Sequence, residues 1–327
     1  MQLGISSFGI GIGPVETVAL ALDAEAAGFA RFMLVERVFT NDSVAMCAAL
    51  AAATTTIGLG TGIANVYLRR PEMLAATSLV AAEVSGGRFT LGLGPNNQAA
   101  MARVGIEWRG ARESLSETTS ALRAILDGSA AGVGPCSVPL PIVWAAVALE
   151  TAELAGREAD GVMLYLATDQ RIDTVLERFE RGVAASARSD GTALERSLLL
   201  PTFLHDDVGA ARTAARSFLS MYAGLAHYQK MFRASGFEAE AGAAEAATAA
   251  GDAEGRAAAV SDRLIDAIVL AGPAAHCRAR LAELRERGLS YVDLAPLPVG
   301  DETLPAAAAR CFAAFGSARA DREEQVR

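Results

Sequence analysis

The sequence has few residues of the kinds that build metal or redox sites, and no run long enough to cross a membrane. Its 327 residues include three histidines and four cysteines. The cysteines at 47, 136, 277 and 311 lack the paired spacing of zinc sites or redox couples, so we expect reduced thiols and no metal. The apolar stretch 137–149 is too short to span a bilayer and contains two prolines.

Positive charge is also scarce. The chain has 29 basic and 38 acidic residues, a formal net charge of −9, and Lys230 is its only lysine. An acidic chain is a poor partner for nucleic acid or anionic membranes, so we expect neither. The first residues lack the charged and apolar regions of a signal peptide, and we therefore expect a cytoplasmic protein.

What the chain does contain is a regular alternation of short strand patterns and longer helical ones. The residues predict strands at 2–7, 32–35, 57–60, 89–93, 142–145, 161–164, 198–203 and 291–294. They predict helices at 15–27, 43–53, 72–84, 112–126, 149–156, 170–187 and 274–287. Alternation of this kind implies parallel strands joined by helices. Eight such strands favour a closed (β/α)8 TIM barrel over an open doubly wound sheet.

One interval interrupts the alternation. Residues 205–270 show only alanine-rich helical sequence, which we interpret as a helical insertion between strands seven and eight of a single domain, 1–327. Within it, 236–255 is poor in large apolar residues. That part is either a mobile lid or a solvated helical appendage.

The most informative segment is 56–71, which predicts a buried strand, a glycine-rich bend and a helix start. Glycine at 58, 60 and 62 lets a flat ligand or another backbone approach closely, because no Cβ intervenes. Pro71 suits the first turn of the next helix. In barrel enzymes the carboxyl ends of the strands carry the site.

Five segments in order resemble the bacterial-luciferase-like superfamily of flavin and deazaflavin oxidoreductases. They cover most of the chain and are 35–42, 56–71, 83–94, 152–162 and 271–294. The Glu36-Arg37-Val38-Phe39 context resembles the branch that uses the deazaflavin coenzyme F420. The resemblance implies a cis peptide bond between Gly62 and Ile63 behind the cofactor ring, and a homodimer.

The resemblance also implies which residues contact cofactor and substrate. The cofactor contacts would be Ser7, Glu36, Thr61, Gly62, Ile63, Asn65, Gly92, Gly94, Ala146, Val147, Leu149 and Thr151. The substrate contacts would be Phe8, Asn96, Trp108, Tyr222 and Tyr228. Trp108 could instead cover a barrel edge, and the two tyrosines could serve helix packing.

Glu36 is the candidate catalytic residue. It is the only carboxylate directly after an apolar strand on this rim in the first half of the chain, and a carboxyl group in a partly dry pocket can serve as a general acid. The alternative is a structural ion pair with Arg37 or Arg69.

The chain departs from the family pattern at two places. Many deazaflavin-dependent members have Asp-His where this chain has Glu36-Arg37, so a histidine base is missing there. Members commonly have Gly-Pro-Lys at the start of helix five, where this chain has Ala146-Val147-Ala148. A helix N-terminus still attracts phosphate, and Arg69 or Arg70 could replace the lysine.

These observations predict an F420-dependent oxidoreductase that exchanges a hydride with a small organic molecule. The cofactor would carry the chemistry, while the protein supplies position and electrostatics. One alternative is a monooxygenase that uses reduced FMN. The other is a relative that binds a ligand without turnover.

Overall fold

Eight parallel strands close into a barrel in the computed structural model, which describes residues 1–37, 41–186 and 193–317. Val38, Phe39 and Ala187 of the predicted segments lie outside these ranges. The barrel strands are β1 (Gln2–Ser7), β2 (Arg31–Leu34), β3 (Gly58–Thr61), β5 (Phe89–Gly94), β6 (Ile142–Ala145), β7 (Gly161–Tyr165), β8 (Glu195–Leu204) and β10 (Tyr291–Pro296). Each pairs in parallel with the next, and β10 pairs with both β1 and β8. The predicted closed barrel is confirmed.

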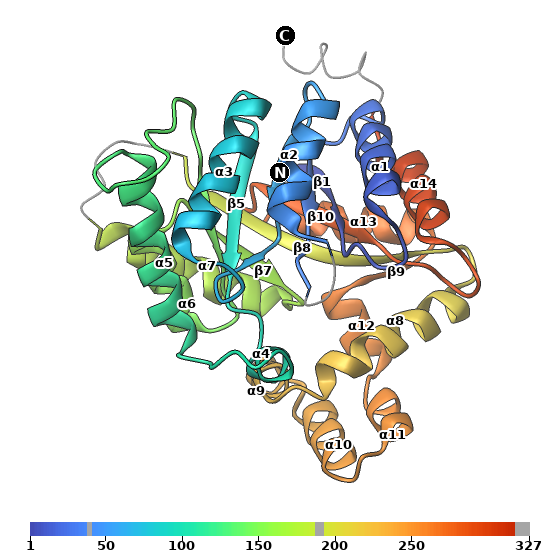
Figure 1. Cartoon of the computed structure of the whole chain (residues 1–327). Coiled ribbons are helices and arrows are strands. Elements are labelled where there is room, and N and C mark those ends of the chain that lie inside the picture. Colours follow the sequence, from blue (N-terminus) through green and yellow to red (C-terminus); the bar gives the residue numbers. More distant parts are fainter. Residues whose placement is uncertain (38–40, 187–192, 318–327) are drawn as a thin grey trace.

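The helices that follow the strands form an outer ring around the barrel (Figure 1). They are α1 (Pro14–Ala26), α2 (Ser43–Ala53), α3 (Pro71–Ser85), α5 (Ala111–Leu126), α6 (Leu149–Glu158), α7 (Asp169–Ala184), α13 (Ala274–Arg285) and α14 (Leu304–Phe315). Pro71 is the first residue of α3, as predicted, and Gly86 ends that helix in the left-handed region at φ 64°.

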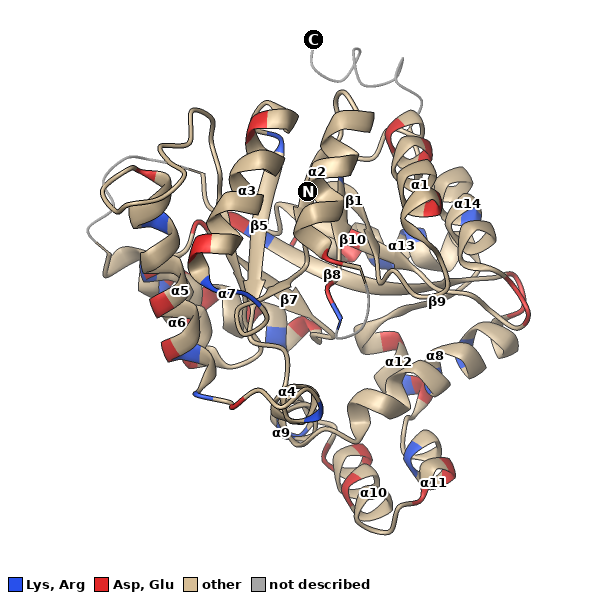
Figure 2. Ribbon diagram, viewed as in Figure 1, with Lys and Arg blue, Asp and Glu red and all other residues tan. Residues whose placement is uncertain are grey.

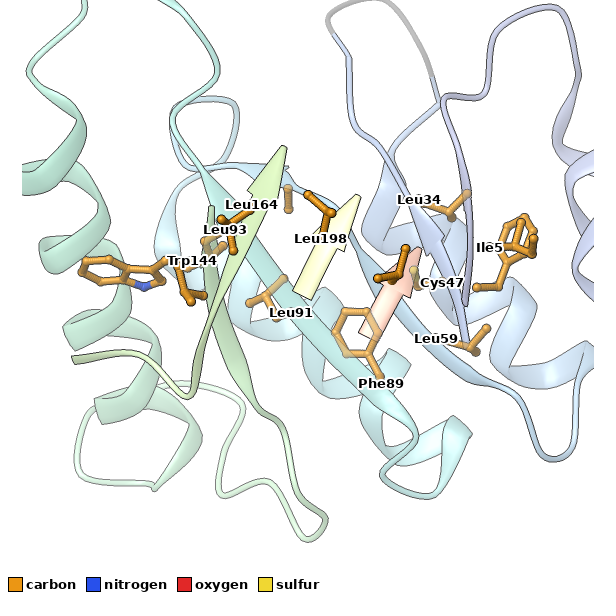
Figure 3. Packing of buried hydrophobic residues seen from close by; sticks show 14 of the residues in the cluster. Ile5, Leu34, Cys47, Leu59, Phe89, Leu91, Leu93, Trp144, Leu164 and Leu198 are labelled. Atoms are coloured by element: carbon orange, nitrogen blue, oxygen red, sulfur yellow. The ribbon is translucent and has the colours of Figure 1, made fainter. Parts of the chain in front are cut away.

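Strand residues alternate between the barrel interior and the helices. Leu34, Leu59, Leu91 and Leu164 belong to the large core between barrel and helices (Figure 3). Their neighbours in sequence face the barrel interior, where Met33, Val143 and Met163 form a separate buried cluster. This alternation decides which residues of the strand ends can reach a ligand.

Buried charge fills the N-terminal end of the barrel. Arg31 Nη1 lies 2.8 Å from Glu195 Oε2, and its Nη2 lies 2.6 Å from Asp293 Oδ2. The guanidinium carbon lies 3.9 Å from the centroid of the Tyr291 ring. Paired on both sides, these charges tolerate burial, and they close this end of the barrel.

The insertion between β8 and β10 is helical. It contains α8 (Val208–Ala223), α9 (Ala226–Ala234), α10 (Glu238–Ala249), α11 (Ala253–Ala258) and α12 (Asp262–Ile268), followed by the short strand β9 (Leu270–Gly272). Helices α8, α9, α10 and α12 share a second hydrophobic cluster, and the insertion lies at the end of the barrel toward which the β5 arrow points (Figure 1). Residues 236–255 form most of α10 and α11; whether they move as a lid stays a prediction.

The sequence analysis omitted four elements. Helix α14, the short helix α4 (Gln98–Arg103) and the short strands β4 (Ala64–Asn65) and β9 are present in the structure. Strand β4 pairs with β5 one step beyond β3. It therefore extends the barrel wall just where the glycine-rich bend of 58–62 ends.

Candidate functional site

Solvent reaches the last layer of the barrel interior at the C-terminal ends of the strands. Val35, Ile63, Ala145 and Tyr165 are partly exposed there, and we call the region they line the mouth. One layer deeper the inward side chains are buried: Met33, Val143, Met163 and Leu199. The mouth therefore has an apolar floor, as expected for a site that receives an organic ring.

The wall of the mouth at β3 and β5 has no room for side chains at two of its glycines. A Cβ at Gly92 would lie 2.0 Å from the backbone oxygen of Thr61, and one at Gly94 would lie 2.6 Å from Ile63 Cγ1. Glycine here lets the end of β3 and the bend that follows it approach β5 closely. The Gly62–Ile63 peptide bond is cis, as the resemblance implied.

Hydrogen bonds hold this bend on both sides. The Gly62 amide donates to the Leu34 carbonyl oxygen at 2.7 Å, and the Glu36 amide donates to the Ile63 carbonyl oxygen at 3.1 Å. On the other side the Thr61 hydroxyl donates to the Gly92 carbonyl oxygen at 2.8 Å. The position of Ile63 at the mouth is therefore fixed by β2 and β5 together.

Glu36 lies at the end of β2 in a saturated network. Arg69 Nη1 and the Asn65 amide each donate to Oε2 at 2.8 Å. Arg69 Nη2 and the amide and hydroxyl of Ser43 donate to Oε1. A carboxylate offers about four lone-pair positions, and five donors use them. The structure thus contains the ion pair with Arg69 that the sequence left as the alternative; proton transfer by Glu36 stays a prediction.

Arg69 extends this network to helix α2. It also binds Asp42, with Nη2 2.7 Å from Oδ2, and Asp42 caps α2 by accepting from the amides of Val44 and Ala45. Burial would raise the pKa of Asp42, but the Ala45 amide and the Arg69 charge outweigh it and lower that pKa. The end of β2, the start of α2 and β4 are therefore one unit.

The predicted cofactor residues lie on neighbouring strand ends. Ser7 ends β1; Thr61, Gly62, Ile63 and Asn65 follow β3 into β4; Gly92 and Gly94 are in β5; and Ala146, Val147, Leu149 and Thr151 lead from β6 into α6. The structure brings these segments to one end of the barrel, as predicted. Whether they bind a cofactor stays a prediction.

The predicted substrate residues do not all lie together. Phe8, Tyr222 and Tyr228 meet around Tyr165, a residue that the sequence analysis did not single out. Trp108 instead packs on Tyr67, whose ring centroid lies 5.2 Å away, which corresponds to the alternative of a covered barrel edge. Asn96 follows β5 with φ 59° and accepts from the Asn97 amide at 2.9 Å.

Arg171 is a second residue that the sequence analysis missed. It lies in the first turn of α7, is half-buried, and its Nη2 donates to the backbone oxygen of Val147 in the loop after β6. Its Nε has no hydrogen-bond partner among the described residues. Only the fold brings it to this loop, because 24 positions separate it from Val147.

The two arginines expected near the phosphate are engaged elsewhere. Arg69 binds Glu36 and Asp42, and Arg70 pairs with Glu72 at the surface. Helix α6 has no side-chain cap at Ala148, and its first amide bonded within the helix is that of Ala152. The first turn of α6 thus keeps donors for an anion, next to Arg171.

Two cavities differ in place and size. One of about 520 Å³ opens between α5 and α6 and is lined by Arg112, Glu113, Ser116, Glu150, Glu153, Leu154, Arg157 and Glu158. A much smaller one, about 20 Å³, lies beside the end of β2 near Val35 and Met46. In the described ranges, no three His, Cys, Asp or Glu side chains are grouped so that they could hold a metal ion. No helix there is long and apolar enough to cross a membrane.

Comparison with known proteins decides the family. The profile of the luciferase-like monooxygenase family matches residues 5–291. The chain belongs to this family. Its relatives and structural neighbours are oxidoreductases and monooxygenases, and it is an oxidoreductase of the luciferase-like family.

Relatives of this luciferase-like protein include reductases of a pterin coenzyme. It is 26% identical over 313 residues to 5,10-methylenetetrahydromethanopterin reductase of Methanolobus tindarius, covering 90% of this chain and 95% of that protein. The structure of the coenzyme F420 dependent tetrahydromethanopterin reductase from Methanopyrus kandleri superposes with a TM-score of 0.77 at 19% identity, over 96% of this chain and 97% of that one. The monooxygenase RslO1 from Streptomyces bottropensis gives 0.67 at 22% identity, over 99% and 100%.

Proposed function

We propose that this luciferase-like oxidoreductase uses coenzyme F420 to transfer a hydride to or from a small organic molecule. The near full-length similarity to the Methanolobus reductase, together with the likeness to the coenzyme F420 dependent reductase from Methanopyrus kandleri, supports the deazaflavin branch. The observation that carries the proposal is the partly exposed mouth, with Ile63 on one wall and Met163 below it. When bound, the deazaflavin supplies the hydride chemistry.

In this proposal the chain's own residues position the ring. Ile63 and Gly94 form the wall behind it, and the Glu36–Arg69 ion pair holds that wall to β2 and α2. Glu36 thus acts as a positioning residue, since its oxygens are occupied by Arg69, Ser43 and Asn65. Ser7, Thr61 and Asn65 supply polar groups around the ring.

The cofactor phosphate would bind at the start of α6. Uncapped amides at Leu149, Glu150 and Thr151 attract an anion, and Arg171 supplies a positive charge with an unpartnered Nε. Arg171 therefore takes the place of the lysine that the family carries in this region. The exposed Glu150 opposes binding only if its side chain turns toward the anion.

The test is a fluorescence titration of the purified protein with F420 and, in parallel, with FMN. We expect F420 to bind more tightly, and we expect Arg171→Ala to weaken F420 binding about tenfold or more, in line with loss of a charged hydrogen bond. Arg70→Ala is the control, because Arg70 lies at the surface and should not alter the affinity. Binding of neither compound would refute the proposal.

The second candidate is an FMN-dependent monooxygenase, favoured by the description of the family whose profile matches. A deazaflavin lacks the ring nitrogen through which a reduced flavin reacts with oxygen, so the cofactor decides the reaction class. Tighter binding of FMN than of F420 in the same titration would favour this candidate.

We also propose that the protein is a homodimer. Exposed apolar side chains gather on three adjacent outer helices, and we call this surface the α1–α3 face: Val15 and Leu22 on α1, Ala45, Ala49 and Ala52 on α2, and Met73, Val80 and Val84 on α3. Helix α2 has no charged residue, and Figure 2 draws it tan along its length. An apolar surface of this kind is typical of a contact between subunits.

A further inference from the structure

Three tyrosines from three elements meet at the mouth. Tyr165 is the last residue of β7, Tyr222 lies near the end of α8, and Tyr228 lies in α9. The ring centroids of Tyr165 and Tyr222 are 5.4 Å apart, and those of Tyr222 and Tyr228 are 5.2 Å apart, both pairs edge to face. Phe218 adds a fourth ring, 5.1 Å from Tyr222. Together they form a rigid aromatic wall.

This wall lies across the barrel from Ile63. In the closed order of strands, β7 and β8 are three and four places from β3. The barrel is narrow enough for side chains to meet across it: a Cβ at Gly62 would contact Met163 of β7 at 3.5 Å and Leu199 of β8 at 3.7 Å. Tyr165 and Tyr222 are partly exposed, whereas Tyr228 is buried behind them. The first two side chains are therefore partly accessible to solvent, and Tyr165 lines the mouth.

The hydroxyls of Tyr165 and Tyr222 share one hydrogen bond, with 2.9 Å between their oxygens. Two hydroxyls joined by one hydrogen bond use one proton and leave the other free to donate. Burial raises the pKa of both phenols. For Tyr222 the hydrogen bond from Tyr165 and the charge of Arg37 act against burial. The pair therefore stays protonated near neutral pH and is a donor rather than a base.

We propose that the Tyr165–Tyr222 pair donates a hydrogen bond to the carbonyl oxygen of an uncharged, flat substrate that lies against the aromatic wall. The inference deepens the proposed function, on which it rests, by naming the substrate class: an aromatic or conjugated ketone or aldehyde. Tyr222 supplies the free proton, Tyr165 orients it, and Phe218, which packs on Tyr222, contacts the ring of the substrate.

The experiment compares two probes of the same shape with the protein free of cofactor. 4-Fluoroacetophenone has the carbonyl oxygen, and 4-fluoro-α-methylstyrene has a methylene group in its place. Affinities come from ¹⁹F NMR titrations. We expect the wild type to prefer the ketone by about 3- to 10-fold, the effect of one neutral hydrogen bond. In Tyr222→Phe the preference should fall to within about twofold, while the affinity for the alkene stays unchanged.

Two variants separate the hydrogen bond from a structural effect. Tyr228→Phe removes a neighbouring phenol that is outside the hydrogen-bonded pair, and Tyr291→Phe removes one at the opposite end of the barrel. Both should keep the ketone preference. Equal affinities for the probes in the wild type, no binding of either, or a preference that survives Tyr222→Phe would overturn the inference. Because no cofactor is present, failure here is distinct from failure to bind F420.

Discussion

At the scale of single residues, the position of Glu36 could be predicted from the sequence, but not all of its partners could. Its place after a buried strand was predictable from the residues around it. Of its partners, Arg69 was one of two that the sequence analysis named, whereas Ser43 and Asn65 were not predicted. Ser43, Asn65 and Arg69 lie 7, 29 and 33 positions away along the chain. Arg171 and Tyr165 were missed because their contacts, Val147 and Tyr222, are distant in the sequence and come close only in the folded chain.

The ion pair of Glu36 makes a stability prediction. Arg69→Ala leaves a buried carboxylate without its cation and should lower the free energy of unfolding by about 3 kcal/mol, measured by urea denaturation. Arg70→Ala is the matched control, since that side chain is 82% exposed and should leave the midpoint unchanged. Equal midpoints for the two variants would show that the Glu36 network does not hold this wall.

Glu25 makes a prediction about pH. Burial would raise its pKa, but hydrogen bonds from the backbone of Thr56, Ile57 and Thr55 outweigh burial and lower the pKa from 4.5 to about 2. A lowered pKa stabilises the fold above about pH 4.5, and this contribution is lost as the pH falls toward 2.

Glu25→Gln should therefore cost about 1–2 kcal/mol at pH 7, a value reduced for solvent screening, and progressively less below pH 4.5. Urea denaturation from pH 7 to pH 3.5 measures this difference. Asp23→Asn changes an exposed carboxylate on the same helix and serves as the control. A difference that does not depend on pH would contradict the assignment.

At the scale of elements, strands and helices with strong patterns were predictable, and the shortest elements were not. All eight barrel strands lie within a few residues of their predicted bounds. Helix α4 has six residues, β4 two and β9 three, which is too short for periodicity to show. Helix α14 is rich in alanine, so its buried and exposed faces look alike in the sequence.

The α1–α3 face makes a prediction about assembly. Val80→Asp places a charge on this surface, where the wild-type side chain is 49% exposed, and should convert a dimer to a monomer in light scattering after gel filtration. Val133→Asp, at a valine that is 45% exposed outside the face, should leave the dimer intact. A monomeric wild type would contradict the dimer, and a dimeric Val80→Asp would place the contact elsewhere.

At the scale of the whole molecule, the sequence specified a closed barrel because eight strands alternate with helices. It could not specify what lies across the mouth from the glycine-rich bend. Tyr165 and Tyr222 come from β7 and α8, elements separated along the chain by α7 and β8. Only closure of the barrel sets them opposite Ile63, across the mouth.

A crystal structure of the protein co-crystallised with F420 would test this arrangement most directly. The account predicts electron density for the tricyclic ring in the mouth, in contact with Ile63 and Gly94 and above Met163, with the phosphate near Arg171. Density for F420 in the cavity of about 520 Å³ between α5 and α6, with the mouth left to solvent, would contradict it.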